Sequence, residues 1–172
     1  MREECLKMAV LPRVVFFIAV VIFNFSEAQN EFAKLPESYR KGVRLAEKQV
    51  NSHNGVQHHF LFFKSLKQSS IEAGYNVNYF YHHFYLKATK CSRGTENADS
   101  KTCVFRNDRP VIDCAMCYKT FNGEILMEPK PYIHCIYKPA LTQEMESSRL
   151  EHCNSMSFSS GTMTLLASIG SE

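Results

Sequence analysis

The stretch VIDCAMCYKT (residues 111–120) carries two cysteines, Cys114 and Cys117, three positions apart in a largely apolar run. Its apolar and β-branched residues, followed by the turn signal Asn122-Gly123, predict a strand over residues 112–121. Successive side chains of a strand point to opposite faces, so an odd separation places the two thiols on different faces of a sheet. They can then neither bond each other nor hold one ion, and each needs its own partner.

Two other chemistries of a CxxC pair fit this sequence less well. A zinc site needs further ligands at a matching spacing, such as a second CxxC or an HxxxH, and the sequence contains neither. A thioredoxin-type redox pair begins a helix after a strand, whereas YKTFNGE (residues 118–124) does not start a helix. We therefore expect structural disulfides, with metal binding and redox exchange as the alternatives.

The N-terminus has the composition of a secretory signal peptide, predicted to span residues 1–28. A basic leader precedes the apolar stretch VVFFIAVVIFNF (residues 14–25), and SEA (residues 26–28) fits a cleavage site between Ala28 and Gln29. The apolar stretch is shorter than the ~20 residues that a membrane-spanning helix needs, and no later segment is long and apolar enough to span a bilayer. We expect a secreted, extracellular protein without a membrane span; an uncleaved membrane anchor is the alternative.

Cleavage would leave six cysteines of seven, because Cys5 lies in the leader. The six are Cys91, Cys103, Cys114, Cys117, Cys135 and Cys153. An even number in an oxidising compartment indicates a disulfide framework, although six cysteines allow 15 connectivities and the sequence does not choose among them. Local geometry favours Cys91–Cys103, which closes a polar connection, and Cys114–Cys135, which joins neighbouring strands, and this leaves Cys117–Cys153.

Periodicity predicts one helix followed by four or five strands. Residues 36–51 place Tyr39, Val43, Ala46 and Val50 on one helical face, with Gly42 as a weak point in the middle. The predicted strands lie in residues 58–67, 77–91, 110–121 and 129–139, and residues 68–76 form the joint between the first two. In the second strand Phe80, Phe84 and Leu86 share an apolar face, while Tyr79, Tyr81 and Tyr85 share a half-exposed face. One helix across a curved antiparallel sheet is an α+β fold.

The stretch AGYNVNYFYHHFYLKATKC (residues 73–91) resembles the cystatin motif A-G-V-N-Y-F that ends in T-x-C. A CxxC whose first cysteine forms a cystatin bridge, and whose second reaches a cysteine after the last strand, resembles the chemerin family. CAMC (residues 114–117) and HC (residues 134–135) match that family, and the resemblance covers residues 36–153. It implies a cystatin-like domain over residues 29–153 and a flexible, processed C-terminal tail over residues 154–172.

The resemblance also implies a function. Chemerin-like proteins are secreted chemoattractant and adipokine precursors, and processing proteases trim their C-terminus so that the new end enters a G-protein-coupled receptor. Phe158 and Gly161 correspond to the aromatic residue and glycine of that end, although their spacing is one residue shorter and two further aromatics are missing. No basic residue follows Cys153 to guide a trypsin-like protease.

Two related functions are alternatives. A cystatin-type inhibitor of cysteine proteases needs a leading glycine, a Q-x-V-x-G hairpin and a Pro-Trp turn, whereas Gln68 and Gly74 are too far apart and the chain has no tryptophan. A cathelicidin-like host-defence protein releases a cationic C-terminal peptide, but no Lys or Arg follows Cys153. Antimicrobial activity from an internal basic stretch is the other form that this alternative takes.

We expect no enzyme, no cofactor and no metal site. The pairs His58-His59 and His82-His83 each offer at most one histidine per strand face, and we expect no carboxylate nearby to orient it; a metal held by His59 and His83 is the alternative. The net charge of +3, which removal of the leader leaves unchanged, argues against a nucleic-acid partner. A cluster of basic residues is a candidate contact for an acidic receptor surface or a glycosaminoglycan: Lys64, Lys67, Lys87, Lys90, Arg93 and Lys101.

Overall fold

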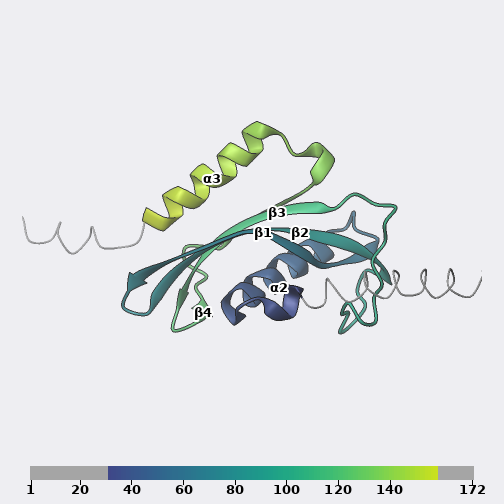
Figure 1. Cartoon of the computed structure of the whole chain (residues 1–172), viewed down its shortest axis with the longest axis horizontal. Helices are drawn as coiled ribbons and strands as arrows, with labels where there is room; N and C mark the ends of the chain where they lie inside the picture. Colours follow the sequence, from purple (N-terminus) through teal and green to yellow (C-terminus); the bar gives the residue numbers. More distant parts are fainter. Residues whose placement is uncertain (1–30, 159–172) are drawn as a thin grey trace, which may run out of the picture.

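The computed structural model describes residues 31–158, in which two long helices lie on opposite faces of an antiparallel sheet (Figure 1). The elements are α2 (Glu37–Ser52), β1 (His58–Gly74), β2 (Val77–Ser92), β3 (Ile112–Phe121), β4 (Glu124–Ile125), β5 (Tyr132–Tyr137), a short 3-10 helix (Lys138–Ala140) and α3 (Gln143–Phe158). The predicted α+β class, with an antiparallel sheet of four to five strands, is confirmed. The predicted signal peptide and its cleavage site between Ala28 and Gln29 lie outside the described residues.

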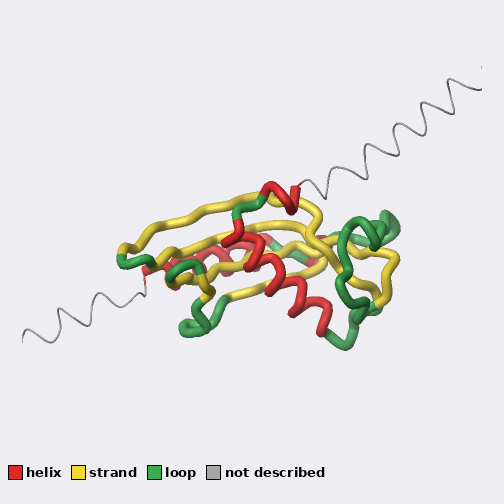
Figure 2. Tube along the Cα trace, turned by 90° about the horizontal axis from the view of Figure 1, so that it is seen from below, coloured by secondary structure: helices red, strands yellow, loops and turns green. Residues whose placement is uncertain are grey.

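Helix α2 forms where the apolar period predicted it and packs across one face of the sheet (Figure 2). Pro36 precedes its first turn, which suits a residue that has no N–H to donate. Val43 and Ala46 on its apolar face are fully buried, and they pack with Phe84 and Leu86 of β2 in one core cluster. In the part of the chain that the structure describes, no helix is long and apolar enough to cross a membrane.

The hairpin of β1 and β2 is longer than the sequence indicated. Strand β1 continues through the expected joint at residues 68–76 as far as Gly74, and only Tyr75 and Asn76 form the turn. Both turn residues have positive φ angles, 51° and 60°, as a tight hairpin turn requires. Pairing with the aromatic strand β2 explains the error, because cross-strand contacts extend a segment whose own strand propensity is weak.

Strand β3 is the centre of the sheet. It pairs with β2 along its whole length, and β4 and β5 both pair with its other edge. Helices α2 and α3 pack on its two faces, and only Phe121 of its ten residues is exposed. Burial on both faces explains why VIDCAMCYKT is apolar without a clean alternation.

Helix α3 was not predicted from the sequence. Most of its surface is exposed, and its buried side chains are Arg149, Cys153 and Met156, at the spacing of one helical stripe. The helix continues to Phe158, so the boundary expected after Cys153 lies inside it. The tyrosine face of β2 is correspondingly less exposed than expected: Tyr79 is 6% exposed and packs with Cys153 and Met156.

Gly42 has a packing role that the sequence did not indicate. A Cβ atom at this position would lie 2.8 Å from both Cε1 and Oη of Tyr118, a fully buried residue of β3. The absence of a side chain therefore allows α2 to approach the sheet, and the hydroxyl of Tyr118 donates a hydrogen bond to the carbonyl oxygen of Ser38, at 2.8 Å. Close packing of α2 on the sheet therefore requires glycine at position 42, although glycine lowers the intrinsic helix propensity there.

We predict that Gly42→Ala lowers the free energy of unfolding by about 1–2 kcal/mol, because overpacking outweighs the better helix propensity of alanine. Denaturant unfolding followed by circular dichroism measures the change. Gly55→Ala is the matched control: its nearest contact is His53 Nδ1 at 3.4 Å, and the same substitution there should be neutral or slightly stabilising. A Gly42→Ala protein as stable as the parent would contradict the packing role.

Candidate functional site

The six cysteines of the described chain form three disulfides: Cys91–Cys103, Cys114–Cys135 and Cys117–Cys153. The first two are the pairs that local geometry favoured, and the third is the pair that these two left over. Cys114 and Cys135 are direct cross-strand partners in the register of β3 and β5, on the α2 side of the sheet. Cys117 belongs to the cluster under α3, so the two cysteines of the CxxC point to opposite faces.

The Cys117–Cys153 disulfide attaches α3 to the centre of the sheet. Three further contacts surround it. The hydroxyl of Tyr79 donates to the carbonyl oxygen of Cys153 at 2.5 Å, the rings of Tyr132 and His152 stack with centroids 4.1 Å apart, and Met156 packs in the same buried cluster as Tyr79. The C-terminal half of α3 is therefore fixed to β2, β3 and β5 together.

A buried ion pair lies one helical turn before the disulfide. Arg149 of α3 donates through Nη1 to a carboxylate oxygen of Asp113 at 2.6 Å and through Nη2 to the carbonyl oxygen of Asp113 at 3.2 Å. Both side chains are 3% exposed. Pairing and hydrogen bonding offset the cost of taking these two charges out of water, and the contact fixes where α3 lies on β3.

Two histidines complete this cluster. Nε2 of His83 lies 3.0 Å from both carboxylate oxygens of Asp113, and Nε of Arg149 donates to Nδ1 of His134 at 2.6 Å. Burial alone would raise the pKa of Asp113, but hydrogen bonds from His83 and Arg149 together hold that pKa below its ordinary value. Burial and the positive charge of Arg149 lower the pKa of His134, so this ring is a neutral acceptor at Nδ1.

The cluster of Asp113, Arg149, His83 and His134 was not predicted from the sequence, and the reason is physical. The expectation that no carboxylate lies near the histidines is wrong, because Asp113 contacts His83 from 30 positions away in the chain. Cross-strand register, which places His83 opposite Ala115, brings them together. One feature of the sequence could have indicated the cluster. Asp113 lies in a strand whose apolar composition predicts burial, and a buried carboxylate needs a cationic partner.

The arrangement does not assemble a catalytic triad. The hydroxyl of Ser65 lies 2.8 Å from Nε2 of His82, but Nδ1 of His82 has no hydrogen-bond partner within residues 31–158. His82 is in the core on the α2 side, where burial and then the neighbouring His83 lower its pKa to about 3. The carboxylate of Asp113 contacts His83 on the opposite face, so the hydroxyl and the acid never share one imidazole.

Of the other predicted site residues, some lie within the described chain and Gly161 does not. The backbone of Phe158 forms the end of α3, and Gly161 lies outside the described residues. His59 and His83 are not brought together, because His59 precedes the Phe60–Ala88 pair whereas His83 is opposite Lys67, farther along the hairpin. The structure finds no group of three potential metal ligands among the residues it describes.

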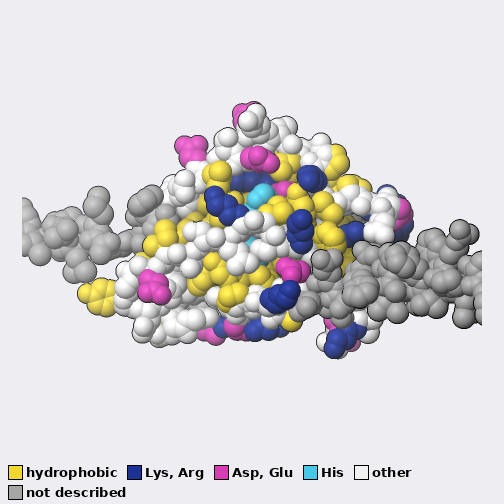
Figure 3. Space-filling view, in the orientation of Figure 1, with side chains coloured by type: hydrophobic (Ala, Val, Ile, Leu, Met, Phe, Trp, Pro, Cys, Tyr) yellow, Lys and Arg dark blue, Asp and Glu magenta, His cyan; other side chains and the backbone are white. Residues whose placement is uncertain are grey.

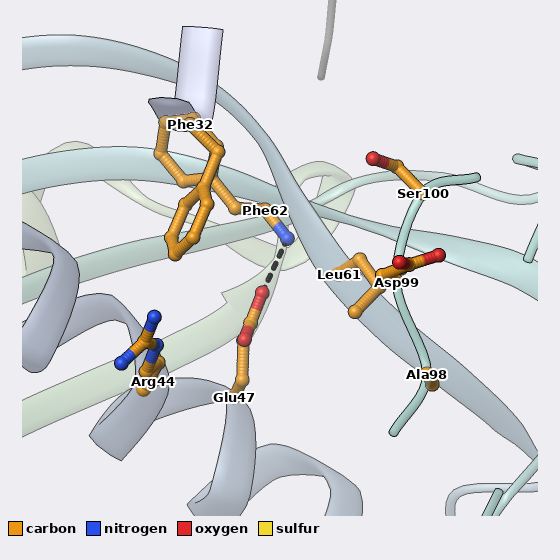
Figure 4. A pocket seen from close by; sticks show the side chains of 8 residues that line it. All are labelled: Phe32, Arg44, Glu47, Leu61, Phe62, Ala98, Asp99 and Ser100. Carbon is orange, nitrogen blue, oxygen red and sulfur yellow. Dashed lines mark hydrogen bonds between the residues drawn. The ribbon is translucent and has the colours of Figure 1, made fainter. Parts of the chain in front are cut away.

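A cavity of about 300 Å³ opens between α2, β1 and the loop after β2 (Figure 4). Glu47 of α2 points into it and accepts a hydrogen bond from the backbone N–H of Phe62 at 2.6 Å. Burial raises the pKa of Glu47 to about 7, against the lowering effects of this bond and of Arg44. Glu47 is therefore a proton-binding group in a mostly apolar recess rather than a solvated charge.

No known protein-family model matches the chain, and a search of curated proteins returns no match. Fold and site geometry therefore carry the functional inference.

We predict that Arg149→Met lowers the free energy of unfolding by about 3 kcal/mol, because it leaves the buried Asp113 carboxylate without its arginine partner. Urea unfolding of the oxidised protein measures the loss. Arg106→Met is the control, since it removes an arginine from an ion pair with Asp108 in which the carboxylate is exposed, and its effect should stay below about 1 kcal/mol. The double variant Asp113→Val/Arg149→Met should be less destabilised than the sum of the single variants; strict additivity would contradict a coupled pair.

We predict that Glu47 makes stability fall as the pH rises. The folded protein keeps the Glu47 proton up to a pKa of about 7, whereas the unfolded chain releases it near the ordinary value of 4.5. The folded state thus loses stability between these pH values, and Glu47→Gln should remove that loss. Denaturant melts at several pH values measure it. Glu96→Gln, on an exposed loop, is the charge-matched control, and a parallel pH profile for the Glu47→Gln and parent proteins would contradict the assignment.

Proposed function

We propose that this protein is a secreted signalling precursor of the chemerin type, in which a cystatin-like domain presents a C-terminal segment to a G-protein-coupled receptor. Processing proteases would trim that segment to its active end. The α+β fold, in which α2 packs across one face of an antiparallel sheet, is compatible with a cystatin-like domain. Three disulfides are consistent with export to an oxidising compartment.

The Cys117–Cys153 disulfide is the observation that carries the proposal. It uses the second cysteine of the CxxC to hold a segment beyond the last strand, which is the arrangement that the chemerin resemblance implies. The chain then continues only five residues to the end of α3 at Phe158. Residues 159–172 thus follow from a fixed point on the domain, as a segment presented to a receptor requires.

The position of that fixed point also fits receptor contact. Figures 1 and 2 place the end of α3 at the same end of the molecule as the β1–β2 turn. Ile71 and Tyr75 near this turn are 51% and 93% exposed, and exposed apolar groups of this kind occur at protein interaction sites.

The structure gives less support to the cystatin-type inhibitor. Gln68 lies inside the hairpin ladder opposite His82, so it is far from the turn at Tyr75 and Asn76 that an inhibitory hairpin would present. The chain also lacks the tryptophan of the second inhibitory loop. Tight inhibition of papain at micromolar concentration would nevertheless favour the inhibitor over the signalling precursor.

We predict that C-terminal trimming activates the protein. Truncated versions that end between residues 158 and 171, applied to cells carrying a chemerin-type receptor, should include at least one that gives a stronger calcium response than the full mature chain. Phe158→Ala in the best truncation should reduce the response, because that end would lose its aromatic group. Calcium imaging over a concentration series measures potency.

Cells without the receptor are the control for unspecific responses. A Ser157→Ala version of the same truncation is the control for substitution in this segment, since this position is present in every truncation and the aromatic residue is kept. If no truncation in this range activates the receptor-bearing cells, the ligand hypothesis is wrong.

A further inference from the structure

Part of the sheet face on the α3 side is left uncovered, and it carries lysines around an aromatic ring. Phe84 and Leu86 of β2 point into the core under α2, so Tyr85 and Lys87 point to the opposite face. Lys64 of β1 is the direct partner of Tyr85, and residues paired in this way share a face. Lys67 is in turn the partner of His83. Two adjacent strands thus present three lysines on one surface.

A fourth lysine joins the group from a distant part of the chain. Lys138, directly after β5, places its Nζ 4.9 Å from the centre of the Tyr85 ring. Lys87 places its Nζ 4.6 Å from the ring centre of Phe63 and donates to the side-chain oxygen of Asn107. We call Lys64, Lys67, Lys87, Lys138 and Tyr85 the lysine–tyrosine surface. Lys and Arg side chains gather around a histidine over the strands below α3 (Figure 3).

The positive charge of this surface is not neutralised within the described residues. No carboxylate of residues 31–158 lies within salt-bridge distance of its four lysines. Asp113 lies beside it, but that carboxylate is buried and paired with Arg149. Glu146 of α3 is close enough to act on the phenol of Tyr81, which lies on the same face of β2. The surface therefore attracts anions.

The other basic residues of the expected cluster lie elsewhere. Arg93 donates to the carbonyl oxygen of His53 at the end of α2, and Lys101 lies in the loop closed by Cys91–Cys103. Lys90 has the same strand parity as the core residue Ala88, so it points away from Lys87. Of the six basic residues singled out in the sequence, three therefore belong to the lysine–tyrosine surface together with Lys138, and three lie outside it.

We propose that the lysine–tyrosine surface binds a sulfated glycan chain. Lysine ammonium groups are suited to sulfates and carboxylates repeated along a polymer, and basic patches of this kind bind heparin-like chains. Tyr85 is half-buried and its hydroxyl is hydrogen-bonded with Lys138, so this tyrosine holds the Lys138 ammonium group at the centre of the surface. Leu66 and Tyr137, which neighbour these lysines in the chain, are 39% and 45% exposed, whereas a membrane would call for a larger apolar group beside the cations. The more exposed Ile71 and Tyr75 lie toward the hairpin turn instead.

Binding of the oxidised protein to immobilised heparin, measured by surface plasmon resonance at physiological ionic strength, tests the proposal. Lys64→Gln/Lys67→Gln should raise the Kd by roughly tenfold, since each exposed lysine contributes a modest electrostatic free energy to binding. Lys48→Gln/Lys101→Gln is the matched control, because it removes the same charge from exposed positions outside the surface. Tyr85→Leu should weaken binding further, while thermal melts check that the variants remain folded.

Three outcomes would overturn the proposal. Equal weakening in the matched control would show that net charge alone drives binding. Equally tight binding of fully desulfated heparin would remove the role of sulfate. Tighter binding to phosphatidylserine vesicles or polyglutamate, with the same dependence on Lys64 and Lys67, would assign the surface to a membrane or an acidic protein. None of these results depends on a receptor response, so the test fails or succeeds independently of the signalling function.

Discussion

Strand β3 is buried on both faces, and the two layers of the molecule are attached to it by different kinds of contact. On one face, Tyr118 packs against Gly42 and the apolar stripe of α2. On the other face, Asp113 and Cys117 hold Arg149 and Cys153 of α3. The strand therefore needs an apolar surface toward α2 and two specific polar or covalent contacts toward α3, and its alternating side chains supply both.

The parts of the fold that rest on apolar burial could be predicted from the sequence. The period of Tyr39, Val43, Ala46 and Val50 gave α2, and the aromatic run in residues 77–91 gave β2. Helix α3 could not be predicted in this way, because its contact stripe consists of an arginine, a cysteine and a methionine among polar residues. A helix held by an ion pair and a disulfide has no hydrophobic period to detect.

The candidate site shows the same division. The even number of cysteines indicated disulfides, and the odd separation of Cys114 and Cys117 along one strand indicated that they bond to different partners. Both features can be read directly from the sequence. The contacts of Asp113 with His83 and Arg149 depend on register and on the position of α3, which spacing does not reveal. The grouping of Lys138 with Tyr85 likewise depends on where β5 ends.

The cross-link between Cys117 and Cys153 also determines how the molecule carries mechanical load. Tension applied to the C-terminal end reaches Cys153 and passes through sulfur into the middle of β3, so the 36-residue span between the two cysteines is bypassed. Strand β5 and the first half of α3 lie within that span and are shielded from the pull. A taut chain end would thus shear the centre of the sheet, where hydrogen bonds on both edges of β3 resist together, instead of unzipping the molecule from its rim.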